Sequence, residues 1–303
     1  MVNISGENVV LVGALLLFVA VMAGKVAYRF GAPALLLFLG VGMLFGLDFI
    51  SYRSVDMTQF VGMIALCIIL FTGGMDTSFQ EIKPIIGPGV VLATVGVVMT
   101  AMVLAGFVWL IAPWIGLQIS FPLALLLAST MSSTDSASVF SILRSKKQGL
   151  KQHLRPLLEL ESGSNDPMAY MLTILLIGVV TNSSGDVSMG MSIVYFVIQM
   201  IVGALSGYLI GRLAVWTINK INLANHSLYS VLLLAFIFFA FAFTDLVKGN
   251  GYLAVYLAGL VVGNHKLTQK RSLTVFFDGF TWLMQIVMFL TLGLFVNSME
   301  LFR

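Results

Sequence analysis

The sequence predicts an all-α polytopic membrane protein, and three observations lead to this fold class. First, 59% of the 303 residues are hydrophobic and only 10% are charged, whereas soluble domains are about half apolar and a quarter charged. Second, the apolar residues gather into windows of about 20, the length of helix that crosses the hydrocarbon core of a bilayer. Third, Lys and Arg gather in alternate connections between these windows, which is typical of membrane topology. Together these observations exclude a soluble globular protein.

Ten apolar windows follow one another along the chain, and each predicts a membrane-spanning helix. They cover residues 8–28, 33–50, 59–75, 85–112, 121–143, 154–181, 190–219, 227–247, 251–264 and 274–297. The first window has no Lys or Arg before it and no small-residue cleavage site after it, so we interpret it as a retained helix and not a signal peptide. Cys67 is the single cysteine of the chain, so we expect neither a disulfide nor a cysteine-based metal site within one chain.

The basic residues predict the orientation of the chain. If the amino terminus is outside, in the periplasm of a bacterium, the outer side keeps only Arg53, Lys248 and Arg303 of the 16 Lys and Arg residues. The other 13 then lie in inner loops, where membrane proteins concentrate positive charge. The net charge of +3 is therefore a topology signal. We expect the lipid bilayer, and no nucleic acid, to be the partner of these charges.

A weak internal repeat relates the front of the chain to its end. At an offset of 220 residues, Gly31 matches Gly251 and Gly73 matches Gly293, among seven pairs that are little above chance in so apolar a chain. The offset aligns the second and third windows with the ninth and tenth, which would run in the opposite direction, as in an inverted-repeat transporter fold. Partners of the fourth to sixth windows would follow residue 303. We therefore expect the second repeat to be incomplete in this chain.

Two acidic residues lie deep inside neighbouring windows, although membrane helices normally avoid charge. An acid at the bilayer centre costs about 2.5 to 3.5 kcal/mol. Asp135 comes nine residues before Arg144, and Asp166 comes eleven after Arg155. On a helix these separations place the two carboxylates roughly 13 and 16 Å from the inner loop, close to the midplane. We expect them to lie side by side on an antiparallel hairpin, at the depth where secondary transporters bind substrate.

The residues around both acids predict interrupted helices. Seven of the ten residues 129–138 carry hydroxyl groups, which can bind backbone groups that leave a helix. Pro167 lacks an N–H and disfavours helical geometry at Asp166. Unwound backbone at this depth is tolerated where it lines protein or a water-filled cavity. Its carbonyls, the Thr134 hydroxyl and two carboxylates would form an oxygen-rich site that suits a hard cation such as sodium or potassium.

One carboxylate is enough to couple a cation to a proton. Removal from water favours the protonated form of a carboxylate, so the group holds a proton until a cation competes for the same oxygens. We predict that Asp166 is this group and that Asp135 and Thr134 are further ligands. Ser162 lies one turn from Asp166 and is either a ligand or a helix-packing residue. Glu161 is either a ligand or a buried ion-pair partner.

Two runs of the sequence resemble the fifth- and sixth-helix motifs of the NhaP-type monovalent cation:proton antiporters. They are residues 133–140, Ser-Thr-Asp-Ser-Ala-Ser-Val-Phe, and residues 161–169, Glu-Ser-Gly-Ser-Asn-Asp-Pro-Met-Ala. The second run is highly specific, and the likeness extends to residues 71–75 and 285–294, so that it covers essentially the whole chain. The resemblance implies an antiporter fold with a core domain and a dimerisation domain. It also implies a homodimer in the bacterial inner membrane that exchanges K⁺ or Na⁺ for H⁺ in pH homeostasis.

The resemblance assigns a role to each residue of the predicted site. It implies that Asp166 exchanges the cation for the proton and that the residues matching Thr134, Asp135 and Ser162 help to hold the ion. Asn165 would tie two crossed broken helices together. An Asn before the essential Asp is usual in electroneutral members, so we predict one proton per cation.

Glu161 would pair with an arginine on a second broken helix, which would lie after residue 303. We therefore predict one exchanger domain over residues 1–303, with about ten helices, about three more to follow, and residues 121–181 as its ion-binding core. A transport-inactive fragment of such an antiporter is one alternative that stays open.

Two other classes of protein also stay open. An intramembrane aspartyl protease would need two midplane aspartates, but it normally shows a Gly-x-Gly-Asp run, which residues 163–166 do not supply. A cation channel could use a similar oxygen-rich site. We favour the antiporter, and we expect neither enzymatic activity nor a cofactor.

Overall fold

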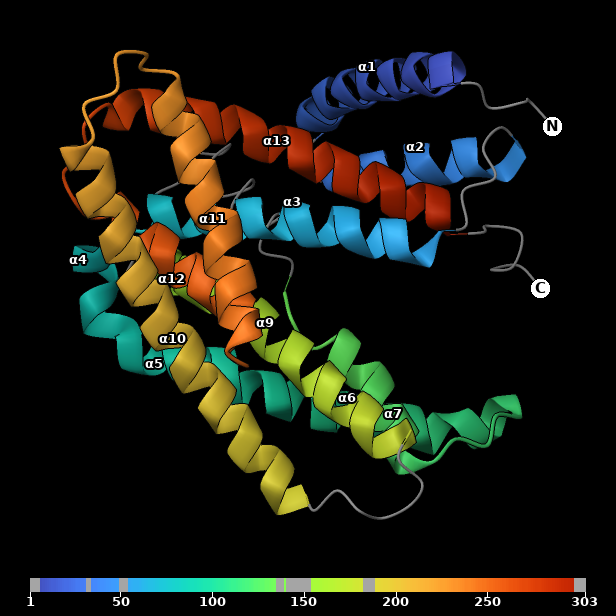
Figure 1. The fold of residues 1–303 in the computed structure, drawn as a ribbon. Coiled ribbons are helices and arrows are strands. Elements are labelled where there is room, and N and C mark those ends of the chain that lie inside the picture. The colour runs from blue at the N-terminus through green and yellow to red at the C-terminus, as the bar shows by residue number, and fades with distance from the viewer. Residues whose placement is uncertain are drawn as a thin grey trace. The chain divides into compact units, whose positions relative to one another are not determined.

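The computed structural model describes residues 6–30, 34–48, 54–134, 139, 154–181 and 189–296. All the regular elements within these ranges are helices (Figure 1). Packing divides the chain into two units. One unit takes the described residues up to Ile69 together with those from Thr274 onward, and the other is Leu70–Leu273.

Each predicted window contains a described helix or a run of helices. In chain order these are α1 (Gly6–Phe30), α2 (Ala34–Asp48), α3 (Val55–Asp76), α4 (Phe79–Ile82), η1 (Lys83–Ile85), α5 (Ile86–Val91), η2 (Leu92–Gly96), α6 (Val97–Ile111), η3 (Ala112–Ile115), α7 (Phe121–Thr130), α9 (Leu154–Thr181), α10 (Met189–Lys220), α11 (Leu228–Leu246), α12 (Gly251–Gly263) and α13 (Lys270–Phe295). The window from 85 to 112 is therefore a succession of α, 3-10 and π turns.

Six of the described helical segments are long and apolar enough to cross a membrane. They are Val55–Asp76, Phe79–Ile115, Leu154–Thr181, Val194–Lys220, Leu228–Leu246 and Lys270–Phe295. The other four windows hold shorter apolar helices of 10–17 described residues, at Val10–Lys25, Ala34–Gly46, Phe121–Thr130 and Gly251–Gly263. The predicted all-α, multi-pass membrane protein is confirmed. The prediction that all ten windows cross the membrane is supported by helix length for six of them.

In the first unit, α2 and α13 cross at glycine. A methyl group added to Gly42 of α2 would overlap the backbone of Leu290 and Gly293 in α13. Small residues at such a crossing allow two helix backbones to approach closely, which is how helices associate where lipid is as apolar as the side chains.

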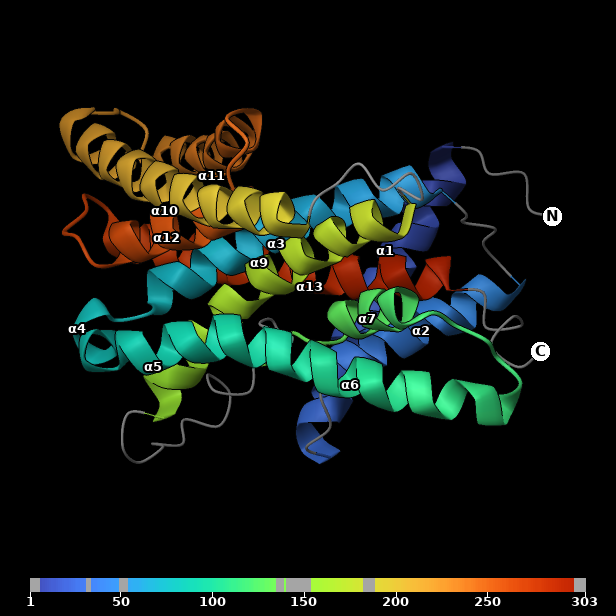
Figure 2. The same cartoon turned by 90° about the horizontal axis from the view of Figure 1, so that it is seen from below.

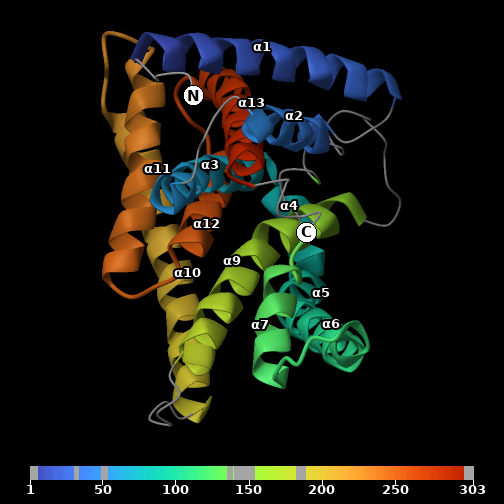
Figure 3. The same cartoon turned by 90° about the vertical axis from the view of Figure 1, so that its right-hand side faces the viewer.

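In the second unit, α12 is a short helix with nearly all of its residues buried. It packs most extensively against α10 (Figure 1). A methyl group on Gly207 of α10 would overlap the backbone of Ala254, and one on Gly259 of α12 would overlap the backbone of Phe71 in α3. Glycine thus brings the backbones of α10 and α3 against α12. On the other side of the second unit, α7 lies between α6 and α9 (Figure 2, Figure 3).

The predicted break in the fifth window is present. α7 ends at Thr130, and Met131 has already left helical geometry. The last carbonyl groups of a helix lack intrahelical partners. Here the Ser129 hydroxyl donates to the carbonyl of Leu126 at 2.7 Å, and the Thr130 hydroxyl donates to that of Leu127 at 2.8 Å. The hydroxyl-rich run therefore binds backbone groups as expected.

The predicted break in the sixth window is wrong. α9 continues through Asp166 and Pro167 without interruption. Proline removes one hydrogen bond from the helix ladder, but α9 is held on both sides by α7 and α12. Tertiary packing therefore overrides the local preference, as it often does for helix propensity.

We predict that Gly259→Ala lowers the free energy of unfolding by about 1–3 kcal/mol, because the new methyl group must displace the backbone of α3. The measurement is the thermal transition of the purified protein in detergent. Gly178→Ala, in α9, is the matched control, because a Cβ there meets nothing within 4 Å. A transition temperature for Gly259→Ala equal to that of the control would contradict the close approach of α3 and α12.

Candidate functional site

The non-helical residues after α7 face the middle of α9. The hydroxyl of Ser133 donates to Oδ1 of Asp166 at 2.7 Å. The Asp166 side chain is half-buried. A hydrogen bond to an ionised carboxylate is stronger than one between neutral groups, so Ser133 stabilises the charged form of this acid. The described end of the polar run thus lies against the acidic helix, as expected, whereas the predicted pairing of Asp135 with Asp166 falls outside the described residues.

A second set of bonds joins the same two segments. The side-chain nitrogen of Asn165 donates to the Thr134 hydroxyl at 2.6 Å and to Oε1 of Glu161 at 2.9 Å. The single hydroxyl proton of Thr134 has two acceptors within reach, Oγ of Ser162 at 3.2 Å and Oε2 of Glu161 at 3.5 Å. The shorter contact is the better hydrogen bond. These four side chains form one polar network next to Asp166.

The amide oxygen of Asn165 is an acceptor of this network that no donor among the described residues reaches. Asn165 is 1% exposed, and its Oδ1 has no hydrogen-bond partner among the described residues. Buried polar atoms are nearly always satisfied by protein, water or an ion. The oxygen is therefore available to a further donor or to a cation.

A cavity of about 650 Å³ reaches this network. Its walls are contributed by the π-helical turn η2, by α6, by the non-helical residues after α7 and by the first turns of α9. The lining residues are Leu92, Gly96, Val97, Thr100, Met131, Ser132, Ser133, Thr134, Leu154, Leu157, Leu158 and Glu161. Most of the wall is apolar, and the polar residues from Ser132 to Thr134 meet Glu161 in it. Single π-helical turns often mark functional sites, and here one shapes the wall opposite the break.

The neighbouring contacts fix α7 to α9. The hydroxyls of Ser129 and Thr173 lie 3.0 Å apart. The single hydroxyl proton of Thr173 has two acceptors within reach, Oγ of Ser129 and the carbonyl of Ala169 at 2.8 Å. Ser129 is fully buried. The break therefore begins at a point where α7 is already in polar contact with α9.

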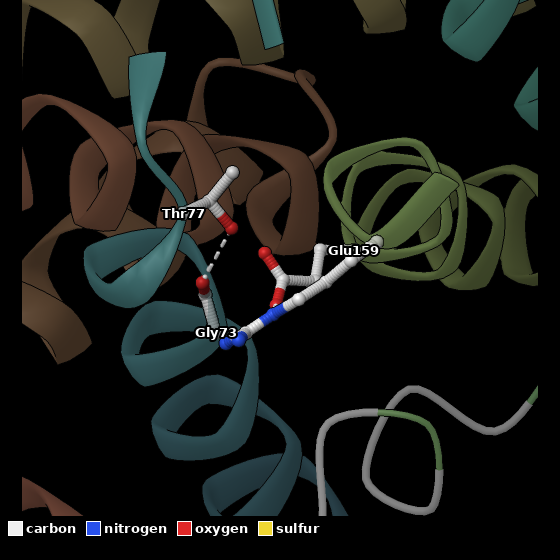
Figure 4. A network of polar contacts seen from close by, with 4 residues as sticks. Gly73, Thr77 and Glu159 are labelled. Atoms are coloured by element: carbon white, nitrogen blue, oxygen red, sulfur yellow. Dashed lines mark hydrogen bonds and ion pairs between the residues drawn. The ribbon is translucent and has the colours of Figure 1, made fainter. Parts of the chain in front are cut away.

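An ion pair lies nearer the start of α9. Arg155 donates to Glu159 at 2.9 Å within the helix. Glu159 is only 9% exposed, and its carboxylate points toward the end of α3, where the Thr77 hydroxyl donates to the carbonyl of Gly73 at 2.8 Å (Figure 4). The buried acid is thus matched by a basic side chain one turn away.

The structure brings together most of the predicted site residues. Those joined by the bonds above are Thr134, Glu161, Ser162, Asn165 and Asp166. Pro167 is buried beside them within α9. Asp135 lies outside the described residues. The roles of all seven as ligands or supports stay predictions.

Two further residues belong to this region. Ser133 is one of seven hydroxyl residues in the polar run, and nothing in the sequence distinguishes it from the others. Asn250 precedes α12 and donates to the carbonyl of Pro167 at 3.2 Å. Its neighbours Lys248, Gly249 and Gly251 give the sequence of an ordinary turn, so no signal points to a partner in α9.

A helical membrane protein with a half-buried carboxylate beside a broken helix is a fold and site typical of secondary transporters. The family described as sodium/hydrogen exchanger, transmembrane, matches residues 14–302 of the chain. The chain belongs to this family of transporters. The predicted membership among cation:proton antiporters of the NhaP type is confirmed by the relatives that follow.

Curated relatives are similar over nearly the whole chain. The K(+)/H(+) antiporter NhaP of Alkalimonas amylolytica is 41% identical over 296 residues, which are 96% of this chain and 50% of that protein. The K(+)/H(+) antiporter NhaP2 of Shewanella sp. (strain ANA-3) is 36% identical over 294 residues, again 96% of this chain and 50% of that protein. The chain spans about half the length of these curated relatives.

The fold is that of a solved antiporter. The sodium proton antiporter MjNhaP1 of Methanocaldococcus jannaschii superposes with a TM-score of 0.76 at 20% sequence identity, over 96% of this chain and 71% of that chain. The predicted antiporter fold is confirmed. The inverted repeat within it stays a prediction.

We predict that Thr134→Val lowers the free energy of unfolding by about 1 kcal/mol, because valine has the same shape but removes the hydroxyl that Asn165 and Ser162 share. Thr134→Ser keeps the hydroxyl and should restore most of the loss. Thr130→Val is the control, since its hydroxyl bonds only to a carbonyl of its own helix. Thermal unfolding in detergent measures all three. Equal transition temperatures for Thr134→Val and Thr130→Val would show that the network does not hold the two segments together.

Proposed function

We propose that this chain supplies the ion-binding part of a secondary antiporter that exchanges K⁺ or Na⁺ for H⁺ across the bacterial inner membrane. The observation that carries the proposal is the bond from Ser133 to Asp166, which joins a broken helix to a carboxylate within a cation:proton exchanger fold. The names of the relatives support cation and proton as the two substrates, with potassium named for those at 36–41% identity.

Competition at Asp166 couples the two ions. In its ionised form the carboxylate accepts from Ser133 and attracts a cation. In its protonated form the carboxyl group is neutral and therefore does not attract a cation. The hydroxyl oxygens of Thr134 and Ser162 lie 3.2 Å apart next to Asp166, and Asp135 is the second carboxylate of the proposed site. Oxygen donors of this kind suit alkali cations.

The neighbours of Asp166 favour a one-to-one exchange. The residue before it is a neutral amide, Asn165, whose nitrogen donates to Glu161 at 2.9 Å. An amide cannot carry the proton or the charge that a second acid at this position would add. Asp166 is then the one residue of the Asn165–Asp166 pair that changes protonation during the cycle.

The cavity provides a route to the site. Leu154 and Leu157 line its wall near the start of α9, which the predicted orientation places on the inner side. Glu161 and Thr134 line the same cavity. A cation from the inner side thus reaches oxygen ligands before it reaches Asp166.

Residues 1–303 form one exchanger domain, with residues 121–181 as its ion-binding core. The amino terminus is periplasmic, the protein is a homodimer, and its activity serves pH homeostasis. The distribution of Lys and Arg supports the orientation, and the resemblance to NhaP-type antiporters supports the dimer.

Everted vesicles containing the complete reading frame test the function. We predict that K⁺ or Na⁺ collapses a preset pH gradient, as followed by a pH-sensitive dye, and that Asp166→Asn reduces this response to the vesicle background. Asp245→Asn is the matched control, because this acid is exposed at the end of α11. It should behave like the unaltered protein. If Asp166→Asn also behaves like the unaltered protein, the site is misassigned. If no folded form responds, the antiport proposal fails.

The stoichiometry has its own test. We predict that the rate of gradient collapse does not change when a membrane potential is imposed with an ionophore, because a one-to-one exchange moves no net charge. A rate that follows the potential, rising or falling with its sign, would rule out electroneutral exchange. A flux that continues without any proton counterflow would indicate a channel.

A further inference from the structure

Asn250 connects three helices of the second unit at a single buried point. Its side-chain nitrogen donates to the carbonyl of Pro167 in α9 at 3.2 Å, and its side-chain oxygen accepts from the backbone of Leu253 in α12 at 3.1 Å. Its backbone N–H donates to the carbonyl of Gln199 in α10 at 3.0 Å. Only 2% of the residue is exposed. Both polar atoms of this side-chain amide therefore form hydrogen bonds. The oxygen caps the N-terminus of α12, and the nitrogen links α12 to α9.

Two aromatic contacts extend the same interface along α9. The ring of Tyr256 packs against Gly163, where a methyl group would overlap the ring. The rings of Tyr252 and Tyr170 meet edge to face, with centroids 5.1 Å apart. Gly163 and Tyr170 lie before and after Asp166 in α9. The interface with α12 therefore supports the turn that carries the carboxylate from both sides.

This turn of α9 needs support from outside the helix. Pro167 has no N–H, so the helix lacks one backbone hydrogen bond next to Asp166. The Asn250 amide binds the carbonyl of the same proline. A donor from the N-cap of α12 thus holds the Pro167–Met168 peptide group, one residue beyond Asp166 and next to the missing backbone bond of α9.

We propose that Asn250 is a positioning residue for the Asp166 carboxylate. Resting on the function proposed above, the inference is that the amide nitrogen fixes the Pro167 carbonyl and thereby the orientation in which Asp166 meets its cation. Asn250 acts through the backbone of α9 and is not itself a ligand. Loss of its nitrogen weakens cation binding, whereas loss of a helix cap alone weakens only the fold.

The substitution Asn250→Ser separates these two roles. Serine is a good N-cap residue, so its hydroxyl can still accept from Leu253. It has no amide nitrogen and is too short to reach Pro167. The matched control is Asn264→Ser at the other end of α12, where the Asn264 nitrogen donates to the carbonyls of Thr77 and Leu260 at 2.8 Å. This change removes a cap of the same helix and leaves the contacts of α9 untouched.

Two readouts compare the variants. One is the cation concentration that gives half-maximal collapse of the pH gradient in vesicles with the complete reading frame. The other is the concentration of K⁺ or Na⁺ that gives half-maximal thermal stabilisation of the purified protein. For Asn250→Ser we expect both concentrations to rise about tenfold, the lower end of the effect of removing an outer partner of an ion ligand, with a smaller change in maximal rate. For Asn264→Ser we expect a lower transition temperature without cation and unchanged half-maximal concentrations.

The outcomes divide cleanly. Half-maximal concentrations for Asn250→Ser equal to those of the unaltered protein overturn the positioning role. The same rise in Asn264→Ser also overturns it, because a cap alone would then be sufficient. If the unaltered protein binds cation but exchanges none, the proposed function fails, and the binding readout alone decides the role of Asn250. If it neither binds nor exchanges, both proposals fall.

Discussion

Hydrocarbon offers the peptide backbone no hydrogen-bond partner, and the architecture of the site follows from how the chain meets this constraint where α7 ends. The hydroxyls of Ser129 and Thr130 bind carbonyls of the preceding turn, which lets the next residues leave helical geometry. Because those residues are no longer helical, Ser133 and Thr134 face α9. The break and the polar network are thus one feature, and neither would persist in lipid without the other.

α9 is the least apolar of the six long spans, and its neighbours explain why it is stable. Its polar residues face the end of α7, while α12 covers Gly163 and Pro167. The two contacts differ in kind. α7 supplies hydroxyl groups to side chains, whereas α12 supplies a ring and an amide to the backbone. One neighbour adjusts the chemistry of the acid, and the other holds the helix that carries it.

The features that could be predicted from the sequence are those with a local physical signal. Apolar windows located the helices, and the hydroxyl run located the break after α7, because both depend on composition over a few residues. Sequence reasoning failed at Pro167, where contacts with two other helices override a local preference. It also missed Asn250, whose partner lies 83 residues away in the chain. No local sequence pattern indicates a contact over that distance. Asp135 lies outside the described residues, so the role of Asp135 stays a prediction.

The unbroken course of α9 has a mechanical consequence. A continuous helix is a stiff rod, since bending it must stretch hydrogen bonds along its length, whereas an interrupted helix bends at its gap. With the Asn250 amide supporting the turn at Pro167, where one backbone hydrogen bond is missing, a displacement applied at the Leu154 end is transmitted past Asp166 to Thr181. α7 ends at Thr130, whereas α9 runs without interruption from Leu154 to Thr181. During a transport cycle the carboxylate of Asp166 would therefore move together with the whole of α9. The hydroxyl groups after α7 would have to shift with it to keep their contacts.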